Sequence, residues 1–302
     1  MVGFFTTTRK DAQVGVDFLP DGVAVAQVSL KPKSHGAVVR AEFLPANGQQ
    51  EQVEALTSWV RGHHLQKAPC VCLISPDDCD VYQVERPQVE AAELTQALTW
   101  KIKDLINYDV EAAVVESYPM PASRSSNQPQ VGVVAAHETV IENYVESIRS
   151  TNLKLSALDI HDLVRPNLDV VQQSAGTSLA LLSLSAGTGS LSVFHDTDLY
   201  VARDFAIGLD KLEQVDADDE TVLDALLVEI QRSLDYFENH YDVGAVNDLR
   251  IFPRVRATEK LAMYLNNLTS YDIDFIEVSL GEISLDPSCF HAYCAALRGA
   301  AA

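Results

Sequence analysis

The chain has 302 residues, which corresponds to about two domains or to one α/β fold in two lobes. Hydrophobic residues make up 47% of it, and 22 Lys and Arg stand against 43 Asp and Glu, for a formal net charge of −21. This composition is typical of a folded protein and excludes a disordered chain. Because such a charge repels phosphate backbones, we do not expect nucleic acid as a partner.

Cysteine and histidine spacing gives no metal site. None of the cysteines forms a CxxC pair, which favours reduced thiols in a cytosolic protein; they stand at positions 70, 72, 79, 289 and 294. His137-Glu138 lacks a second histidine four residues later, so a metalloprotease helix is not predicted. No apolar run approaches the ~18 residues that span a bilayer, and the start does not resemble a signal peptide, so we expect a cytoplasmic location.

The first half of the chain alternates predicted strands and helices. The run from Gln13 to Leu30 is rich in β-forming residues and is broken by Pro20-Asp21-Gly22, which predicts a tight hairpin. Asp17 lies near the end of its first strand. Hydrophobic periodicity then predicts a helix, a strand, a helix, two strands, a helix, and a strand that leads into a helix; these cover 51–64, 70–74, 89–106, 113–119, 131–136, 138–150 and 153–171.

The second half opens in the same way. Three strands in a meander are expected over 179–184, 191–194 and 199–205. Acidic residues at 216–220 precede a long amphipathic helix, and we interpret them as a helix N-terminus rather than a metal site. A strand, a helix, a strand and a terminal helix that starts at Asp286-Pro287 follow; the first three are predicted at 249–252, 258–268 and 275–278. Two halves that begin alike indicate a duplicated α/β architecture.

Five ordered segments resemble the PilM family of type IV pilus assembly proteins; they lie at 15–28, 133–164, 179–212, 227–237 and 286–299. The resemblance implies an actin-like fold, the duplicated RNase H-like α/β fold in two lobes. The first lobe would cover 13–172, with an inserted helix-strand-strand-helix subdomain at about 87–156 as in PilM- and FtsA-like proteins. The second would cover 173–302, with a helical part at about 216–248.

The resemblance also implies two phosphate loops. Asp17 would position the metal of a nucleotide, although it also suits the capping of a hairpin turn, and the other loop candidates are Gly22, Gly187, Thr188 and Gly189. At several positions the family has glycine, serine, lysine or an acidic residue, and this chain has another residue. These positions are Leu19, Pro20, Asp21, Ala24, Ser183, Ser185 and the run Arg254-Val255-Arg256. The bulk of Leu19, the missing N–H of Pro20 and the negative charge of Asp21 oppose phosphate binding. We therefore expect a degenerate pocket, no catalytic residue, no metal site and no cofactor.

Two functions remain open. The first is a pseudo-ATPase adaptor of a type IV pilus machine, which the resemblance implies would bind the N-terminal cytoplasmic tail of a PilN-like bitopic inner-membrane protein. That tail would lie in a groove between the first lobe and the insert, and would hold the protein at the inner membrane. The alternative is a nucleotide-binding actin-like ATPase that uses Asp17, Gly22, Thr188 and Gly189 with Mg-ATP. The oligomeric state is open, a homo-oligomer included.

Overall fold

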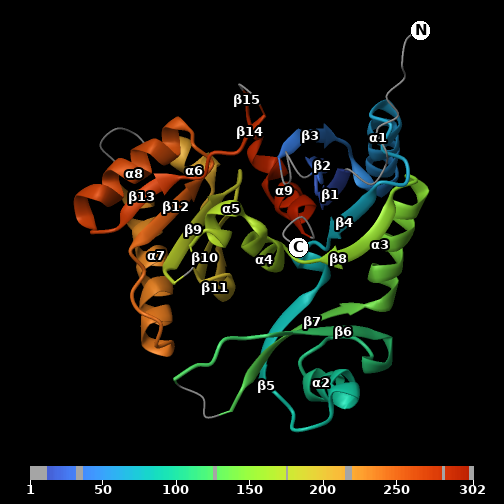
Figure 1. The fold of residues 1–302 in the computed structure, drawn as a ribbon, viewed down its shortest axis with the longest axis horizontal. Coiled ribbons are helices and arrows are strands. Elements are labelled where there is room, and N and C mark those ends of the chain that lie inside the picture. Colours follow the sequence, from blue (N-terminus) through green and yellow to red (C-terminus); the bar gives the residue numbers. More distant parts are fainter. Residues whose placement is uncertain are drawn as a thin grey trace.

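In this computed structural model two lobes lie side by side, and a smaller unit lies below one of them (Figure 1). The structure describes residues 12–31, 37–124, 128–174, 176–214, 220–280 and 283–298. Within these ranges no helix combines the length and the hydrophobicity needed to cross a bilayer.

The first lobe is built on a five-stranded sheet of order β3-β2-β1-β4-β8. Its strands are β1 (Ala12–Leu19), β2 (Gly22–Ser29), β3 (Val38–Pro45), β4 (Pro69–Leu73) and β8 (Lys154–Asp159). β1 and β2 pair antiparallel with Leu19 opposite Gly22, which confirms the predicted hairpin. β3 was not predicted, because Arg40 and Glu42 interrupt its apolar residues, and none of its residues is fully buried.

Helices cover both faces of this sheet, so β2 is buried along its whole length. One face carries α1 (Gly48–Gly62) and α3 (Glu138–Ser150), whose Leu56, Val60 and Ile148 share a core with β1 and β4. The helices predicted over 51–64 and 138–150 are confirmed, and each buries apolar residues in this core.

The smaller unit is a three-stranded sheet of order β5-β7-β6. Its elements are β5 (Asp80–Glu85), α2 (Leu94–Ile102), β6 (Ala113–Pro119) and β7 (Gln130–His137). It differs from the expected insert at both ends, because β5 precedes residue 87 and α3 packs into the first lobe. β5 was not predicted, because its sequence lacks a strict alternation of apolar and polar residues. In the structure Val84 is its one buried residue. α2 is also shorter than the helix predicted over 89–106.

The second lobe repeats the topology of the first in a sheet of order β11-β10-β9-β12-β13. Its strands are β9 (Ser178–Leu184), β10 (Gly189–His195), β11 (Asp198–Phe205), β12 (Asp248–Phe252) and β13 (Asp272–Phe275). In both sheets three antiparallel strands are followed by two parallel ones, which confirms the predicted duplication. The last of these strands lies three residues before its predicted position.

Helices α6 (Leu209–Glu213), α7 (Thr221–His240) and α8 (Arg256–Leu268) belong to the second lobe (Figure 1). The predicted stripe on α7 is confirmed, because Leu226, Ile230 and Phe237 are buried against the sheet. Four residues of the acidic segment, 216–219, lie outside the described residues. The short strands β14 (Ser279–Leu280) and β15 (Ile283–Ser284) form a separate pair.

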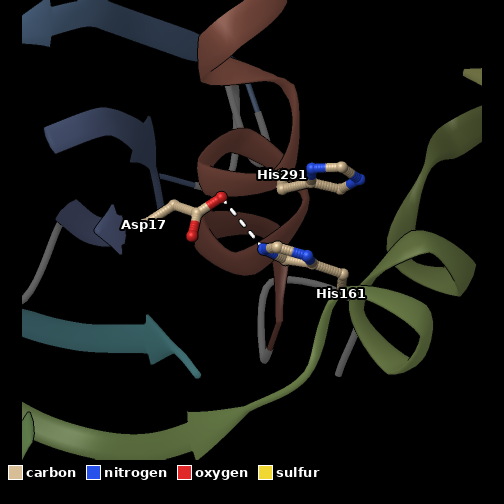
Figure 2. Close-up of side chains that lie close together, drawn as sticks. All are labelled: Asp17, His161 and His291. Atoms are coloured by element: carbon tan, nitrogen blue, oxygen red, sulfur yellow. Dashed lines mark hydrogen bonds and ion pairs between the residues drawn. The ribbon is translucent and has the colours of Figure 1, made fainter. Parts of the chain in front are cut away.

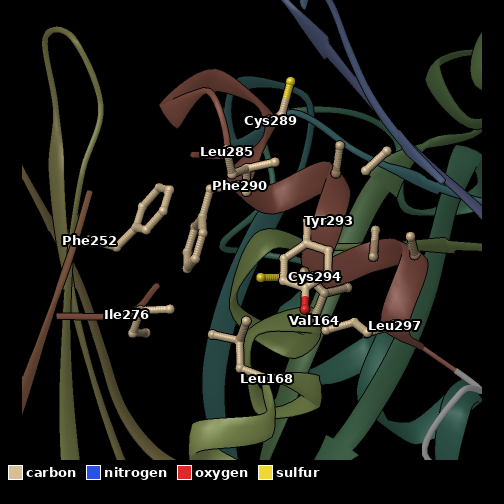
Figure 3. Packing of buried hydrophobic residues seen from close by; sticks show 14 of the residues in the cluster. Val164, Leu168, Phe252, Ile276, Leu285, Cys289, Phe290, Tyr293, Cys294 and Leu297 are labelled. Carbon is tan, nitrogen blue, oxygen red and sulfur yellow. The ribbon is translucent and has the colours of Figure 1, made fainter. Parts of the chain in front are cut away.

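Three helices lie between the two sheets: α4 (His161–Val164), α5 (Asp169–Gln172) and α9 (Phe290–Leu297). They complete one apolar cluster, part of which Figure 3 shows. The cluster also includes residues of both sheets, such as Leu73 of β4 and Leu181 of β9. Phe290 stacks on Phe252 of β12 with ring centroids 4.2 Å apart. Asp286 caps the turn before α9 by accepting a hydrogen bond from the Ser288 N–H, as predicted. The lobes therefore share a continuous core.

Candidate functional site

Asp17 lies near the end of β1, where two parallel strands and the interlobe helices meet. Its side chain is 1% exposed, and its Oδ2 accepts a hydrogen bond from His161 Nε2 at 3.0 Å. His161 is placed there because α4 begins directly after β8. The carboxylate thus faces the connection between the lobes instead of capping the hairpin turn. Its Oδ1 has no donor among the residues that the structure describes.

Two histidines stack beside this carboxylate. His161 and His291 of α9 have ring centroids 4.3 Å apart and an interplanar angle of 17° (Figure 2). Burial lowers the pKa of His161, but the charge and the hydrogen bond of Asp17 outweigh it and raise that pKa above its usual value. Burial, with the nearby charges of His161 and Arg165, lowers the pKa of His291 well below its usual value. Of the two imidazoles, His161 is therefore the one that binds a proton more readily, and His291 is held in its neutral form.

Arg165 completes the cluster. Its side chain is 2% exposed, and its Nη1 donates to Asp162 Oδ1 at 2.7 Å and to Ser192 Oγ at 2.8 Å. Its Nη2 lies 3.3 Å from His291 Nε2. Because a guanidinium only donates, that imidazole nitrogen accepts, in agreement with a neutral His291.

Asp17, His161 and His291 offer ligand atoms that all lie within 4.8 Å of one another. A metal ion bound to a histidine lies in the plane of its ring, however, and these two rings are nearly parallel. A buried guanidinium also contacts His291 and opposes a cation by charge. The observed geometry is therefore that of a hydrogen-bonded charge network, which we call the histidine–arginine cluster (Asp17, His161, Asp162, Arg165 and His291).

The first predicted phosphate loop is the β1–β2 turn, with Pro20 and Asp21 exposed at its tip. Gly22 serves packing here: a Cβ atom at this position would lie 2.5 Å from the carbonyl oxygen of Leu44 and 2.6 Å from the ring of Phe43. A residue with a side chain would push β3 away from β2.

The second predicted loop, between β9 and β10, is closed by its own hydrogen bonds. The Ser185 N–H donates to the carbonyl of Thr188 at 2.9 Å, and the two hydroxyls are 2.8 Å apart. The start of α6 packs on it, because Leu209 N–H donates to the carbonyl of Ser185 and Asp210 N–H to that of Ala186.

The glycines of this loop differ in their surroundings. A Cβ atom at Gly189 would lie 2.2 Å from the ring of Phe205, whereas Gly187 faces open space. In the described part of the chain no hydrogen bond joins Asp17 or Gly22 to residues 187–189. The run Arg254-Val255-Arg256, which also departs from the family pattern, is engaged as well, since Arg254 forms ion pairs with Glu259 at 3.1 Å and Glu277 at 2.7 Å.

A cavity of about 390 Å³ lies beside the β1–β2 turn. Its walls are the turn itself, the first turn of α1, the short 3-10 helix Pro76–Asp78 and one face of α3. The lining residues are Phe18, Leu19, Pro20, Gln49, Gln52, Ser75, Asp77, Asp78, Val140, Asn143, Tyr144 and Ser147. A second cavity of about 310 Å³ lies between β5 and β11, each of which is an edge strand.

Sequence reasoning missed most of these residues. Of the histidine–arginine cluster only Asp17 was singled out, because its partners stand about 145 to 275 residues away and form no motif. A polar pair in the otherwise apolar run Ile160 to Val164 was the one available signal. The cavity residues Asp77 and Asp78 gave none, since exposed acids are ordinary in a chain this acidic.

Comparisons with known proteins agree with this architecture. No family model matches the sequence, and no curated protein matches it in a sequence search. Among solved structures, the PilM-PilN type IV pilus biogenesis complex is similar with a TM-score of 0.70 and 15% identity, covering 97% of this chain and 99% of that one. The cytoplasmic domain of EpsL, an inner-membrane component of the type II secretion system of Vibrio cholerae, reaches a TM-score of 0.51 at 14% identity, covering 96% and 94%.

At these identities the likeness concerns the fold. Its extent over nearly all of both chains, together with the duplicated sheets, confirms the predicted fold class. The chain has the two-lobed actin-like fold, in the form that the PilM structure also adopts.

Proposed function

We propose that the chain is a PilM-like cytoplasmic adaptor of a type IV pilus machine that binds the N-terminal cytoplasmic tail of a PilN-like inner-membrane protein. That tail would also hold it at the inner membrane. The similar structure is a complex of PilM with PilN, and the likeness extends over 97% of this chain. The observation that carries the proposal is the cavity between the β1–β2 turn and α3, a helix that was expected in the insert and that packs into the first lobe.

The lining of this cavity suits a short extended peptide. Phe18 and Val140 offer apolar surface, and the carboxamides of Gln49 and Asn143 offer donors and acceptors for peptide groups. The α3 wall is tied to the segment 75–78 on the far side of the cavity lining, because Tyr144 accepts a hydrogen bond from Ser75 N–H at 3.0 Å and donates to Asp78 Oδ2 at 2.7 Å. A preformed groove of this kind lowers the entropic cost of binding.

Charge favours a basic tail. Asp77 and Asp78 lie exposed at one end of the cavity, and the whole chain carries −21. Segments on the cytoplasmic side of a membrane helix carry an excess of Lys and Arg. The acidic surface would therefore steer such a tail toward the groove, and association would slow as salt screens the field.

The test measures binding of a fluorescein-labelled synthetic peptide that carries the cytoplasmic N-terminal residues of the PilN-like protein from the same organism. Val140→Arg fills the cavity from α3 and is expected to weaken binding at least tenfold, as expected when a contact worth about 1.4 kcal/mol is lost. Val145→Arg is the matched control, since it makes the same change on the same helix outside the cavity lining. Stopped-flow association rates are expected to fall with ionic strength.

If the two variants bound the peptide with equal affinity, the peptide would not bind in this groove. If the folded wild-type protein did not bind the peptide, the adaptor function would be contradicted. Association rates that stay constant from low to high salt would remove the steering argument alone.

We further propose that nucleotide does not control this binding. The start of α6 packs on the second loop, Gly22 is required by β3, and Asp17 is engaged by His161. The altered loops resemble those of MshI, a PilM-like protein of the mannose-sensitive haemagglutinin pilus, and on that resemblance we propose that pilus as the machine served. Loss of that pilus on deletion of the gene, with other type IV pili retained, would be the expected phenotype.

A further inference from the structure

The connection between the lobes, residues 161–167, binds polar groups of both sheets. It begins directly after β8 of the first sheet and leads to β9 of the second. His161 donates to Asp17 of β1 at 3.0 Å, and Arg165 donates to Ser192 of β10 at 2.8 Å. One stretch of seven residues therefore contacts both lobes through side-chain hydrogen bonds.

These contacts are buried and charged. Asp17, Arg165 and Ser192 have at most 2% of their surface exposed. Removing one partner of a buried charged pair leaves the other without compensation, which costs far more than the loss of a surface ion pair. The bonds to Asp17 and Ser192 are therefore expected to persist in the native state.

The charges that face His161 come from four elements. Asp17 belongs to β1, Asp162 and Arg165 to the connection itself, Asp204 to β11, and the neutral His291 to α9. With His161 protonated, two positive charges stand against three carboxylates, so the cluster is close to balanced.

A polar network can fix the relative orientation of the lobes, which the apolar core between them does not. The cluster around Phe252 and Phe290 holds the lobes together, but apolar burial has little directional preference. Hydrogen bonds weaken steeply when their angle changes, so the bonds of His161 and Arg165 fix how the two sheets are oriented.

We propose that residues 161–167 form a clasp that holds the two lobes in one relative orientation without any ligand between them. The clasp binds Asp17 through the side chain of His161. In the family resemblance, Asp17 is the carboxylate that would position the metal of a nucleotide. This inference does not depend on the pilus function, because it concerns the lobes and not the groove beside α3.

The first measurement is the distance between spin labels at Glu54→Cys on α1 and Met263→Cys on α8, in a Cys79→Ser background. Glu54 and Met263 are exposed, whereas the four remaining cysteines are buried. Arg165→Met removes the donor and keeps the apolar volume. It is expected to broaden the distance distribution and to raise hydrogen exchange of residues 161–167 roughly tenfold, in line with the loss of a charged hydrogen bond.

Ser192→Ala severs only the bond to the second sheet and is expected to act in the same direction with a smaller effect. Ser190→Ala is the matched control, because Ser190 is also buried, lies on the same strand and faces the same side. It is expected to behave as wild type. If Arg165→Met does not fold, the distance distribution and hydrogen exchange of Ser192→Ala test the clasp on their own.

Two results would overturn the clasp. One is a narrow distance distribution and wild-type exchange in the folded Arg165→Met and Ser192→Ala variants. The other is stoichiometric binding of Zn²⁺ that is lost in His291→Gln, because the cluster would then be a metal site. A protein that fails to bind the PilN-derived peptide but retains the clasp results would refute only the proposed function.

Discussion

Replacing Phe290 with alanine tests whether the two lobes unfold as a single unit. The ring is 1% exposed, comes from a helix that packs on β1 and β2, and stacks on Phe252 of the second sheet at 4.2 Å. Truncation of a buried phenylalanine costs about 3–5 kcal/mol. Of this, about 0.5–1.5 kcal/mol belongs to the aromatic pair and is expected as the coupling energy in a double-mutant cycle with Phe252→Ala.

The two tryptophans make the assay specific. Trp59 lies on α1 and Trp100 on α2, so tryptophan fluorescence reports on the first lobe and the small unit, whereas circular dichroism reports on all helices. In urea, both signals are expected to give one midpoint for wild type and the same lower midpoint for Phe290→Ala.

Phe237→Ala is the decisive comparison, because Phe237 is fully buried in the core of the second lobe only. If the lobes are coupled through their shared core, this distant change also lowers the fluorescence midpoint. A fluorescence midpoint that stays at the wild-type value, while the circular dichroism midpoint falls, would refute the reasoning and show that the lobes unfold independently.

Three further predictions concern the histidine–arginine cluster. His291 has a lowered pKa, so the unfolded chain takes up a proton below pH ~6.5 that the folded one refuses. Stability should then fall by up to ~1.4 kcal/mol per pH unit, and a Tm series from pH 7.5 to 5.5 should show a shallower fall in His291→Gln. Mg-ATP should give no saturable heat in titration calorimetry; one-site binding that disappears in Asp17→Ala would instead support the ATPase alternative.

The pH argument has a second side, because His161 has a raised pKa. Its ion pair with Asp17 contributes stability that is fully present below pH ~6.5 and is lost as the pH rises through the folded-state pKa. Since the two pKa values shift in opposite directions from that of an ordinary histidine, His161→Gln is expected to flatten the Tm profile above pH ~6.5 and leave the fall below it in place.

Local sequence determined the elements that have a strong periodic signal. The β1–β2 hairpin followed from Pro20-Asp21-Gly22, α7 from its apolar stripe, and the cap of the terminal helix from Asp286-Pro287. These signals depend on neighbours within a few residues. The repeated opening of the two halves was enough to predict the duplicated fold, because the same order of strands and turns recurs in both.

Tertiary structure alone decided the rest. β3 and β5 have polar or irregular sequences and become strands only because β2 and β7 pair with them. Asp17 could be singled out from its place in a hairpin, but its partners come from α4 and α9, and no local pattern connects residues 17, 161 and 291. Such a cluster exists because packing brings distant segments together, and no local sequence pattern predicts that these segments lie close in space.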